Sequence, residues 1–209
     1  AYITETNYRQ EYKTNPNLIT PVLNIDTINF HKKLNKNPIV IYPDIINKKK
    51  FGENTFFRYL LNYPGLLGEP IDFNNKDEIA FVYSKKIAEK LDIANHVLFI
   101  PMIDTNIFYP NPNILRDKKL SYFYASKYKN YHRENTFEIT NNSIEITRFQ
   151  KDSPTPHQIA DYFRKANFFA SYEDTALITE AIFCRCPVML IKNQYFNGIP
   201  LAIEELGLF

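Results

Sequence analysis

Short runs of apolar and β-branched residues alternate along this chain with segments of helical periodicity, and this alternation constrains the fold more than any other feature. The runs predicted to be strands are 38–43, 79–83, 97–100, 120–125, 143–148, 167–170 and 187–191. The segments predicted to be helices are 54–61, 84–91, 156–165 and 174–183. Because strands that alternate with helices pair in the same direction, the predicted fold class is α/β with parallel sheets.

A proline-containing segment divides this alternation into two parts. Residues 106–113 include Pro110 and Pro112, which favour an irregular linker. The predicted domains are therefore 1–110 and 111–209. Residues 1–37 are polar and interrupted by prolines, so we predict an irregular arm there, with room for one short strand.

The charge and the glycine content exclude several classes of ligand site. The 25 basic and 23 acidic residues give a net charge of +2 spread over both halves, without the basic patch that duplex nucleic acid requires. With five glycines, the chain contains neither G-x-G-x-x-G nor G-x-x-x-x-G-K-[ST], the two glycine-rich phosphate-binding motifs. We therefore predict no nucleic-acid partner, and any phosphate would have to bind at helix N-termini and side chains.

Cysteine usage and hydropathy bear on the cellular location. Cys184 and Cys186 stand one residue apart and form no disulfide framework, so a reducing cytoplasm is the predicted location. No apolar run in the sequence approaches the roughly 18 to 20 residues that span a bilayer. The four histidines are scattered and lie away from the cysteines, so no metal site is predicted.

Open parallel sheets bind ligands beyond the carboxyl ends of their strands. Polar residues follow four predicted strands, at Asp44, 83–84, 126–127 and 171–175. After the last of these, Asp174 or Thr175 can cap the next helix and leave its N-terminus to a diphosphate. Glu180, in an otherwise apolar part of that helix, can accept hydrogen bonds from a ribose diol. The simpler alternatives are a cap without a ligand and a solvated glutamate.

Residues 171–191 form a distinctive pattern. An acidic residue, Glu173 or Asp174, precedes a helix that contains Glu180-Ala181, and a turn then leads to Pro187-Val188. The pattern resembles the donor-site signature of nucleotide-sugar glycosyltransferases of GT-B architecture, in which two Rossmann-like lobes face each other across a cleft. In the retaining members the two carboxylates are one residue further apart than Glu173 and Glu180, so either Glu173 or Asp174 can take the first acidic role.

Two further segments resemble the same family. Within 97–110, a predicted strand is followed by Asp104, Phe108 and Pro110, which match the segment between the lobes. Residues 40–46 and 58–65 are similar to bacterial surface-polysaccharide glycosyltransferases. The first lobe is shorter than usual for the family, which leaves open whether this chain is a compact member or a fragment.

The resemblance implies transfer of a sugar from a nucleotide-diphosphate sugar to a glycan or lipid-linked acceptor, with no metal or other cofactor. The residues that it assigns to the donor are Lys127, Arg148, Glu173, Asp174, Thr175 and Glu180. Among them Glu180 would hold the ribose, and Lys127 and Arg148 would neutralise the charge of the leaving diphosphate. Asp44 would act as the base toward the acceptor.

Two other functions stay open at this point. A nucleotide-sugar epimerase shares the architecture, although the scarcity of histidine argues against it. A non-catalytic or truncated module that assembles with a partner would also fit the short first lobe. Residues 118–132 are basic and aromatic, and they would then contact a partner or a membrane surface, with Lys127 solvated.

Overall fold

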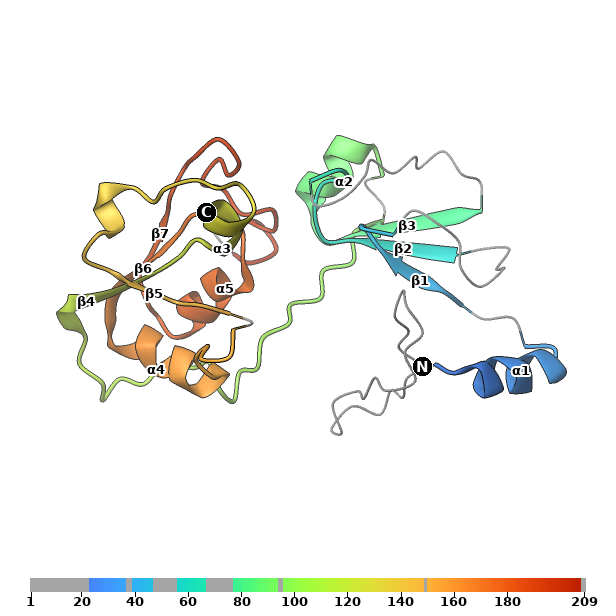
Figure 1. Ribbon diagram of the computed structural model, residues 1–209, viewed down its shortest axis with the longest axis horizontal. Helices are drawn as coiled ribbons and strands as arrows, with labels where there is room; N and C mark the ends of the chain where they lie inside the picture. Colours follow the sequence, from blue (N-terminus) through green and yellow to red (C-terminus); the bar gives the residue numbers. More distant parts are fainter. Residues whose placement is uncertain are drawn as a thin grey trace. The chain divides into compact units, whose positions relative to one another are not determined.

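The computed structural model describes residues 23–36, 39–46, 56–66, 77–93, 96–148 and 150–207. The chain forms two compact units, one of residues 1–60 and 64–81 and the other of residues 61–63 and 82–209. Each unit contains a sheet with parallel strands, and the chain also forms helices, as the α/β prediction requires (Figure 1). The division predicted after residue 110 falls inside the second unit.

The first unit contains a three-stranded sheet. Its strands are β1 (Ile41–Pro43), β2 (Phe56–Leu60) and β3 (Glu78–Val82), in the order β1-β2-β3, with β1 and β2 parallel. The prediction of a helix over 54–61 is wrong, because β2 alternates in burial as a strand does, with Phe56, Arg58 and Leu60 buried. The buried Tyr42 packs edge to face on Phe56 at 5.5 Å between ring centroids.

A helix that the sequence analysis did not predict precedes this sheet. Helix α1 (Ile25–Lys33) begins where Asn24 accepts a hydrogen bond from the Thr27 N–H at 2.8 Å. Lys32 and Lys33 lie in its last turn, where positive charge stabilises a helix end. The irregular arm predicted for 1–37 is therefore wrong over this helix, and residues 1–22 lie outside the described residues.

The second unit contains a four-stranded parallel sheet. Its strands are β4 (Asp117–Tyr124), β5 (Ile144–Glu145), β6 (Ala166–Ser171) and β7 (Val188–Leu190), in the order β5-β4-β6-β7. From β4 the chain first moves outward to β5 and then returns to β6 on the other side (Figure 1). The carboxyl ends of β4 and β6 therefore flank a topological switch point, the usual ligand position in such sheets.

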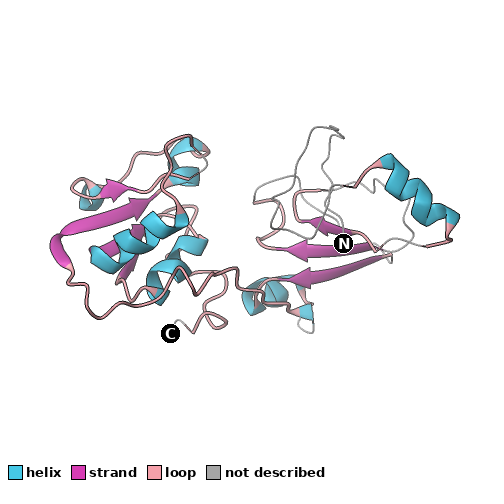
Figure 2. Ribbon diagram, turned by 90° about the horizontal axis from the view of Figure 1, so that it is seen from below, coloured by secondary structure: helices cyan, strands magenta, loops and turns pink. Residues whose placement is uncertain are grey.

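Helices cover both faces of this sheet (Figure 2). They are α3 (Ser126–Asn130), the short 3₁₀ helix η2 (Glu138–Thr140), α4 (Pro156–Lys165) and α5 (Ala176–Phe183). Helix α2 (Lys85–Leu91) contributes no residue to the two cores that pack on this sheet. Side chains of α4 and α5 pack with Tyr122 and Tyr124 of β4 in one core, whereas Phe123 packs with Tyr128 of α3 in another. Alternate residues of β4 thus enter opposite cores, as the pleat of a strand requires.

Local sequence signals explain where the helices of this unit begin. Thr155 and Gln158 form a capping box at α4 with Pro156 in its first turn, and the bounds predicted for that helix, 156–165, are confirmed. Ser84 accepts the Ile87 N–H and caps α2, so the helix predicted over 84–91 begins one residue later, at Lys85.

Arg116, just before β4, ties the ends of α4 and α5 to the sheet. Its Nη1 donates to the carbonyls of Phe163 and Ala166 at 2.8 Å each, and its Nη2 donates to those of Cys184 and Arg185 at 3.2 and 2.5 Å. A cation at these helix C-termini is favourable because the terminal carbonyls there lack partners within the helix.

The strands predicted at 79–83, 120–125, 167–170 and 187–191 are confirmed within one to three residues at each end. Two others are shorter than predicted. Of the run 143–148 only Ile144–Glu145 pairs with β4, and of the run 97–100 only Val97 forms a bridge, to Val82. Both runs are apolar enough for a strand, but along most of their length no neighbouring strand of the described residues pairs with them.

Candidate functional site

The carboxyl ends of β4, β5, β6 and β7 lie side by side, and most of the predicted donor residues follow them. Lys127 comes after β4, Arg148 after β5, and Glu173 and Asp174 after β6. Glu180 joins them from α5. The structure thus gathers side chains from positions 127 to 180 at one edge of one sheet, whereas Asp44 belongs to the first unit.

Glu180 and Arg148 form the central contact of this edge. The Nη2 atom of Arg148 lies 2.9 Å from each carboxylate oxygen of Glu180. The Glu180 side chain is 8% exposed and that of Arg148 is 25% exposed, so the carboxylate is enclosed while the guanidinium reaches solvent. Burial raises the pKa of Glu180, and the charge of Arg148 opposes this rise.

Glu173 is buried and serves the neighbouring helix. Its Oε1 accepts the backbone N–H of Lys127 at 2.7 Å, which fixes the first turn of α3. Its Oε2 is buried without a hydrogen-bond partner among the described residues. Burial raises the pKa of Glu173, and the hydrogen bond from Lys127 opposes the rise.

Asp174 and Thr175 separate into two different roles. Thr175 is the N-cap of α5 and accepts the Leu177 N–H at 3.4 Å, which resolves the choice between the two predicted caps. Asp174 instead accepts the Leu201 N–H at 2.7 Å and anchors the segment that follows β7. Burial raises the pKa of Asp174 as well. A carboxylate that already binds a backbone amide is less free to contact a ligand than the sequence suggested.

Lys127 carries an exposed side chain that forms no ion pair among the described residues. Its charge acts on both Glu173 and Asp174, whose pKa values it lowers against the effect of burial. The nearby Lys129 differs, since its Nζ pairs with Glu145 at 2.5 Å. Lys127 is therefore the cation of α3 that is available to a ligand.

The interpretation of residues 118–132 as an exposed basic and aromatic surface is wrong for much of its length. Tyr122, Tyr124 and Tyr128 are buried, and Tyr128 packs on Tyr172 at 5.0 Å between ring centroids. Tyr122 and Tyr124 belong to β4, and Tyr128 belongs to α3. Tyr131, at the end of the stretch, is 64% exposed.

Tyr124, the last residue of β4, lies within the electrostatic reach of Glu173 and Arg148 and was not among the predicted residues. Its side chain is buried, its hydroxyl hydrogen-bonds with Ser126, and its pKa is raised by burial and by the charge of Glu173. Arg148 acts on the same hydroxyl in the opposite direction. A tyrosine at a predicted strand end was the available signal, but an aromatic residue in a strand more often packs in the core.

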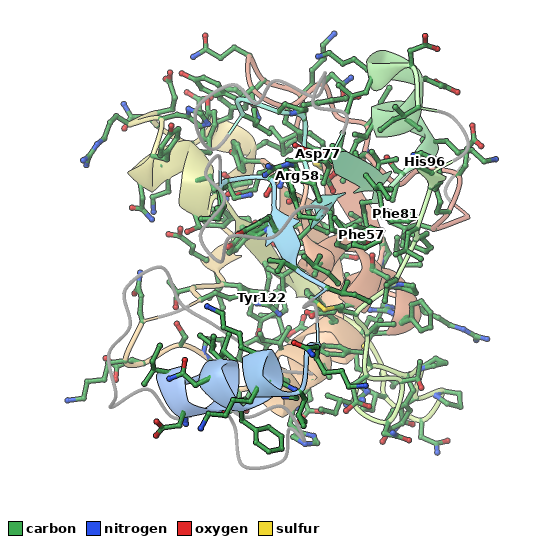
Figure 3. The ribbon with its side chains drawn as sticks, turned by 90° about the vertical axis from the view of Figure 1, so that its right-hand side faces the viewer. Phe57, Arg58, Asp77, Phe81, His96 and Tyr122 are labelled. Carbon is green, nitrogen blue, oxygen red and sulfur yellow. The ribbon has the colours of Figure 1, made fainter. Side chains whose placement is uncertain are left out.

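In the first unit, Asp44 lies on a turn that a buried arginine holds in place. The Ile46 N–H donates to the Pro43 carbonyl at 3.3 Å, and Arg58 donates from Nη1 to the carbonyls of Pro43 (3.2 Å) and Ile46. The Nε of Arg58 pairs with Glu78 of β3, and the two side chains are 2% and 4% exposed. Figure 3 labels Arg58 and Phe57 on β2. A helix over 54–61, as predicted, would not place Arg58 beside β3, so this support was not among the expected contacts.

Metal and thiol chemistry find little support in the described residues. Among them no group of three or more His, Cys, Asp or Glu side chains is arranged to hold a metal ion. Cys184 and Cys186 are free and buried, and burial raises the pKa of each to about 11, so neither is a reactive thiolate at neutral pH. None of the helices in the described part of the chain has the length and apolar character needed to cross a bilayer.

Comparison of the chain with protein-family models, with curated proteins and with solved structures gives no match. The geometry of the strand ends and the chemistry of the side chains there are therefore the evidence of function.

Proposed function

We propose that this protein is a glycosyltransferase that moves a sugar from a nucleotide-diphosphate sugar to a glycan or lipid-linked acceptor of surface polysaccharide. The observation that carries the proposal is the enclosed Glu180 carboxylate beside Arg148, at the carboxyl edge of a parallel sheet and next to its switch point. An acceptor for two hydroxyls and a cation for a phosphate are what a ribose diphosphate needs from a protein without glycine-rich loops.

In this proposal the second unit binds the donor. Glu180 accepts the hydrogen bonds of the ribose diol, and Arg148 and Lys127 stabilise the negative charge that develops on the leaving diphosphate. The N-terminus of α5, capped by Thr175, adds its dipole on the same edge. Glu173 and Asp174 support this site through the backbone of α3 and of Leu201.

The first unit would bind the acceptor in this proposed GT-B-like enzyme. Asp44 would accept the proton of the attacking acceptor hydroxyl as the new glycosidic bond forms and the nucleoside diphosphate leaves. Its turn is held by Arg58, so the carboxylate sits on a fixed backbone. No metal enters this proposed reaction.

A thermal-shift panel with UDP, GDP, ADP, CMP and dTDP tests the donor site. A ligand at about 100 times its dissociation constant stabilises the native protein by roughly 2.7 kcal/mol. We expect a selective shift with one nucleotide that is lost in Glu180→Gln and kept in Lys118→Ala, which removes an exposed charge at the opposite end of β4. The absence of a shift with every nucleotide would overturn the proposal.

A non-catalytic nucleotide-binding module is the second candidate. It is favoured by Glu173 and Asp174, since the carboxylates of both bind backbone amides of the protein itself. Hydrolysis or transfer of the sugar from the nucleotide sugar that binds separates the two functions. Release of nucleoside diphosphate that disappears in Asp44→Asn supports the enzyme, and binding without release supports the module.

A further inference from the structure

The two side chains that the proposed donor site needs for different parts of one ligand are bound to each other. Arg148 would take a phosphate and Glu180 a ribose, yet Nη2 of Arg148 lies 2.9 Å from both Oε1 and Oε2 of Glu180. A single nitrogen at equal distance from both oxygens occupies the face between them. That face is also where the two hydroxyls of a cis-diol would donate, so the arginine and the diol compete for it.

The environment of the pair makes such an exchange feasible. The Glu180 side chain is 8% exposed and has no ion-pair partner other than Arg148 in the described part of the chain, so its charge requires a donor at all times. Arg148 is 25% exposed and uses one of its nitrogens on Glu180, which leaves the rest of its fork for an anion. The guanidinium can therefore turn from the carboxylate to a phosphate and still be paired with an anion.

We infer that Arg148 and Glu180 form a latch that a nucleoside diphosphate opens and that neither half of this ligand opens alone. This inference rests on the proposed function. A diol that displaces Arg148 leaves the guanidinium without an anion, and a phosphate that attracts Arg148 leaves the buried carboxylate without a donor. A ligand with both groups satisfies both side chains together. The latch thus selects molecules that carry a ribose diol and a phosphate over nucleosides and over inorganic phosphates.

The latch predicts opposite effects of its two members on the two halves of the ligand. In Arg148→Ala the carboxylate is released, so nucleoside affinity should rise about fivefold, which corresponds to the loss of a partly exposed ion pair. In the same variant pyrophosphate affinity should fall about tenfold through loss of a charged hydrogen-bond donor. Glu180→Gln should do the reverse, weakening the nucleoside and strengthening pyrophosphate. Both variants should weaken the nucleoside diphosphate.

Isothermal titration of the full chain at pH 8 measures these effects. The probes are UDP, GDP, ADP and CDP, their four parent nucleosides, and inorganic pyrophosphate. Lys118→Ala matches the charge change of Arg148→Ala away from this edge and should alter none of the affinities. Circular dichroism verifies that each variant is folded, and Glu180→Gln, which leaves no unpaired buried charge, carries the test if Arg148→Ala does not fold.

The possible failures are distinguishable. If both variants weaken the nucleoside and pyrophosphate alike, the pair acts as one preformed site and the latch is wrong, although the proposed function stands. If nucleoside affinity does not change in Arg148→Ala, the two groups do not compete and the latch is again wrong. If the wild-type protein binds none of the nucleoside diphosphates, the proposed function fails and the latch fails with it.

Discussion

Each unit of this protein contains an arginine–glutamate pair, and the two pairs differ in how many hydrogen-bond donors of the arginine are already used. In the first unit, Arg58 and Glu78 are 2% and 4% exposed, and the guanidinium also donates to two carbonyls of the turn that carries Asp44. In the second unit, Arg148 is 25% exposed and its one hydrogen-bond partner in the described residues is Glu180.

The same two residue types therefore serve different purposes, which depend on how many N–H donors of the arginine have no partner within the protein. A fully buried guanidinium is bonded to a carboxylate and to backbone carbonyls. If it moved away, these acceptors would be left buried without hydrogen-bond donors, so it fixes the structure. A half-buried guanidinium bonded through one nitrogen can change partner at little cost. The first pair is a structural support and the second is suited to binding. Four substitutions or titrations test this comparison.

The largest expected effect is that of Arg58→Met. It leaves Glu78 buried without its arginine and removes a donor from two carbonyls, so the free energy of unfolding should fall by about 3 to 5 kcal/mol. Urea unfolding followed by far-UV circular dichroism measures the change, because the chain has no tryptophan for fluorescence. Hydrogen exchange should place the loss in β1, β2 and β3. The double variant Arg58→Met with Glu78→Met should regain part of the stability. A loss below about 1 kcal/mol in Arg58→Met alone would show that the buried pair is no more important for stability than the partly exposed one.

Arg148→Met should cost less, about 1 to 2 kcal/mol at neutral pH, because this arginine is partly solvated. The cost should also shrink in mild acid. Removing Arg148 leaves the buried Glu180 carboxylate unpaired, and protonation of that carboxylate removes the penalty. Urea unfolding of the variant and of the wild type at several pH values gives the comparison. A loss as large as that of Arg58→Met would show that exposure does not distinguish the pairs.

The wild-type second unit should itself become more stable as the pH falls from neutral toward about 4.5, the ordinary pKa of a glutamate. Burial raises the pKa of Glu173, Asp174 and Glu180, so the folded unit holds these protons more tightly than the unfolded chain does. Their contribution is complete below the ordinary carboxyl pKa and is lost as the pH rises through the raised values. Glu173→Gln should flatten the profile, and an unchanged slope would refute the role assigned to that carboxyl.

The smallest expected effect is that of Lys129→Ala, which removes a pair with side chains 39% and 27% exposed. Ion pairs of this exposure contribute about 0.2 to 1 kcal/mol, and added salt reduces that contribution. Thermal unfolding at low and high salt should show a small loss that salt abolishes. A loss that persists in salt would mean that packing of the Lys129 side chain, rather than its charge, stabilises α3.

The sequence predicted most of the second unit because its signals there are local. The capping box at Thr155, the cap at Ser84 and the apolar runs of β6 and β7 act within a few residues, and they produced the correct elements. The same local rules missed α1, whose cap at Asn24 and basic last turn were present in the sequence but were outweighed by the neighbouring prolines.

The error at 54–61 has a non-local cause. The run around Arg58 contains aromatic residues on both sides, and its periodicity does not separate a helix from a strand. What makes it a strand is that Arg58 meets Glu78, twenty residues further along the chain, and the turn after β1. A charged residue at a buried position is acceptable only when such partners are in place, and no local pattern reports them.

The sequence by itself determined the fold class, the predominantly parallel pairing, and the set of polar residues that follow the strands of the second unit. Those features depend on apolar periodicity and on caps, which act over short distances along the chain. Tertiary structure alone decided the partner of each of these residues. It bound Glu173 to Lys127, Asp174 to Leu201 and Glu180 to Arg148, because buried carboxylates take the nearest donor in space.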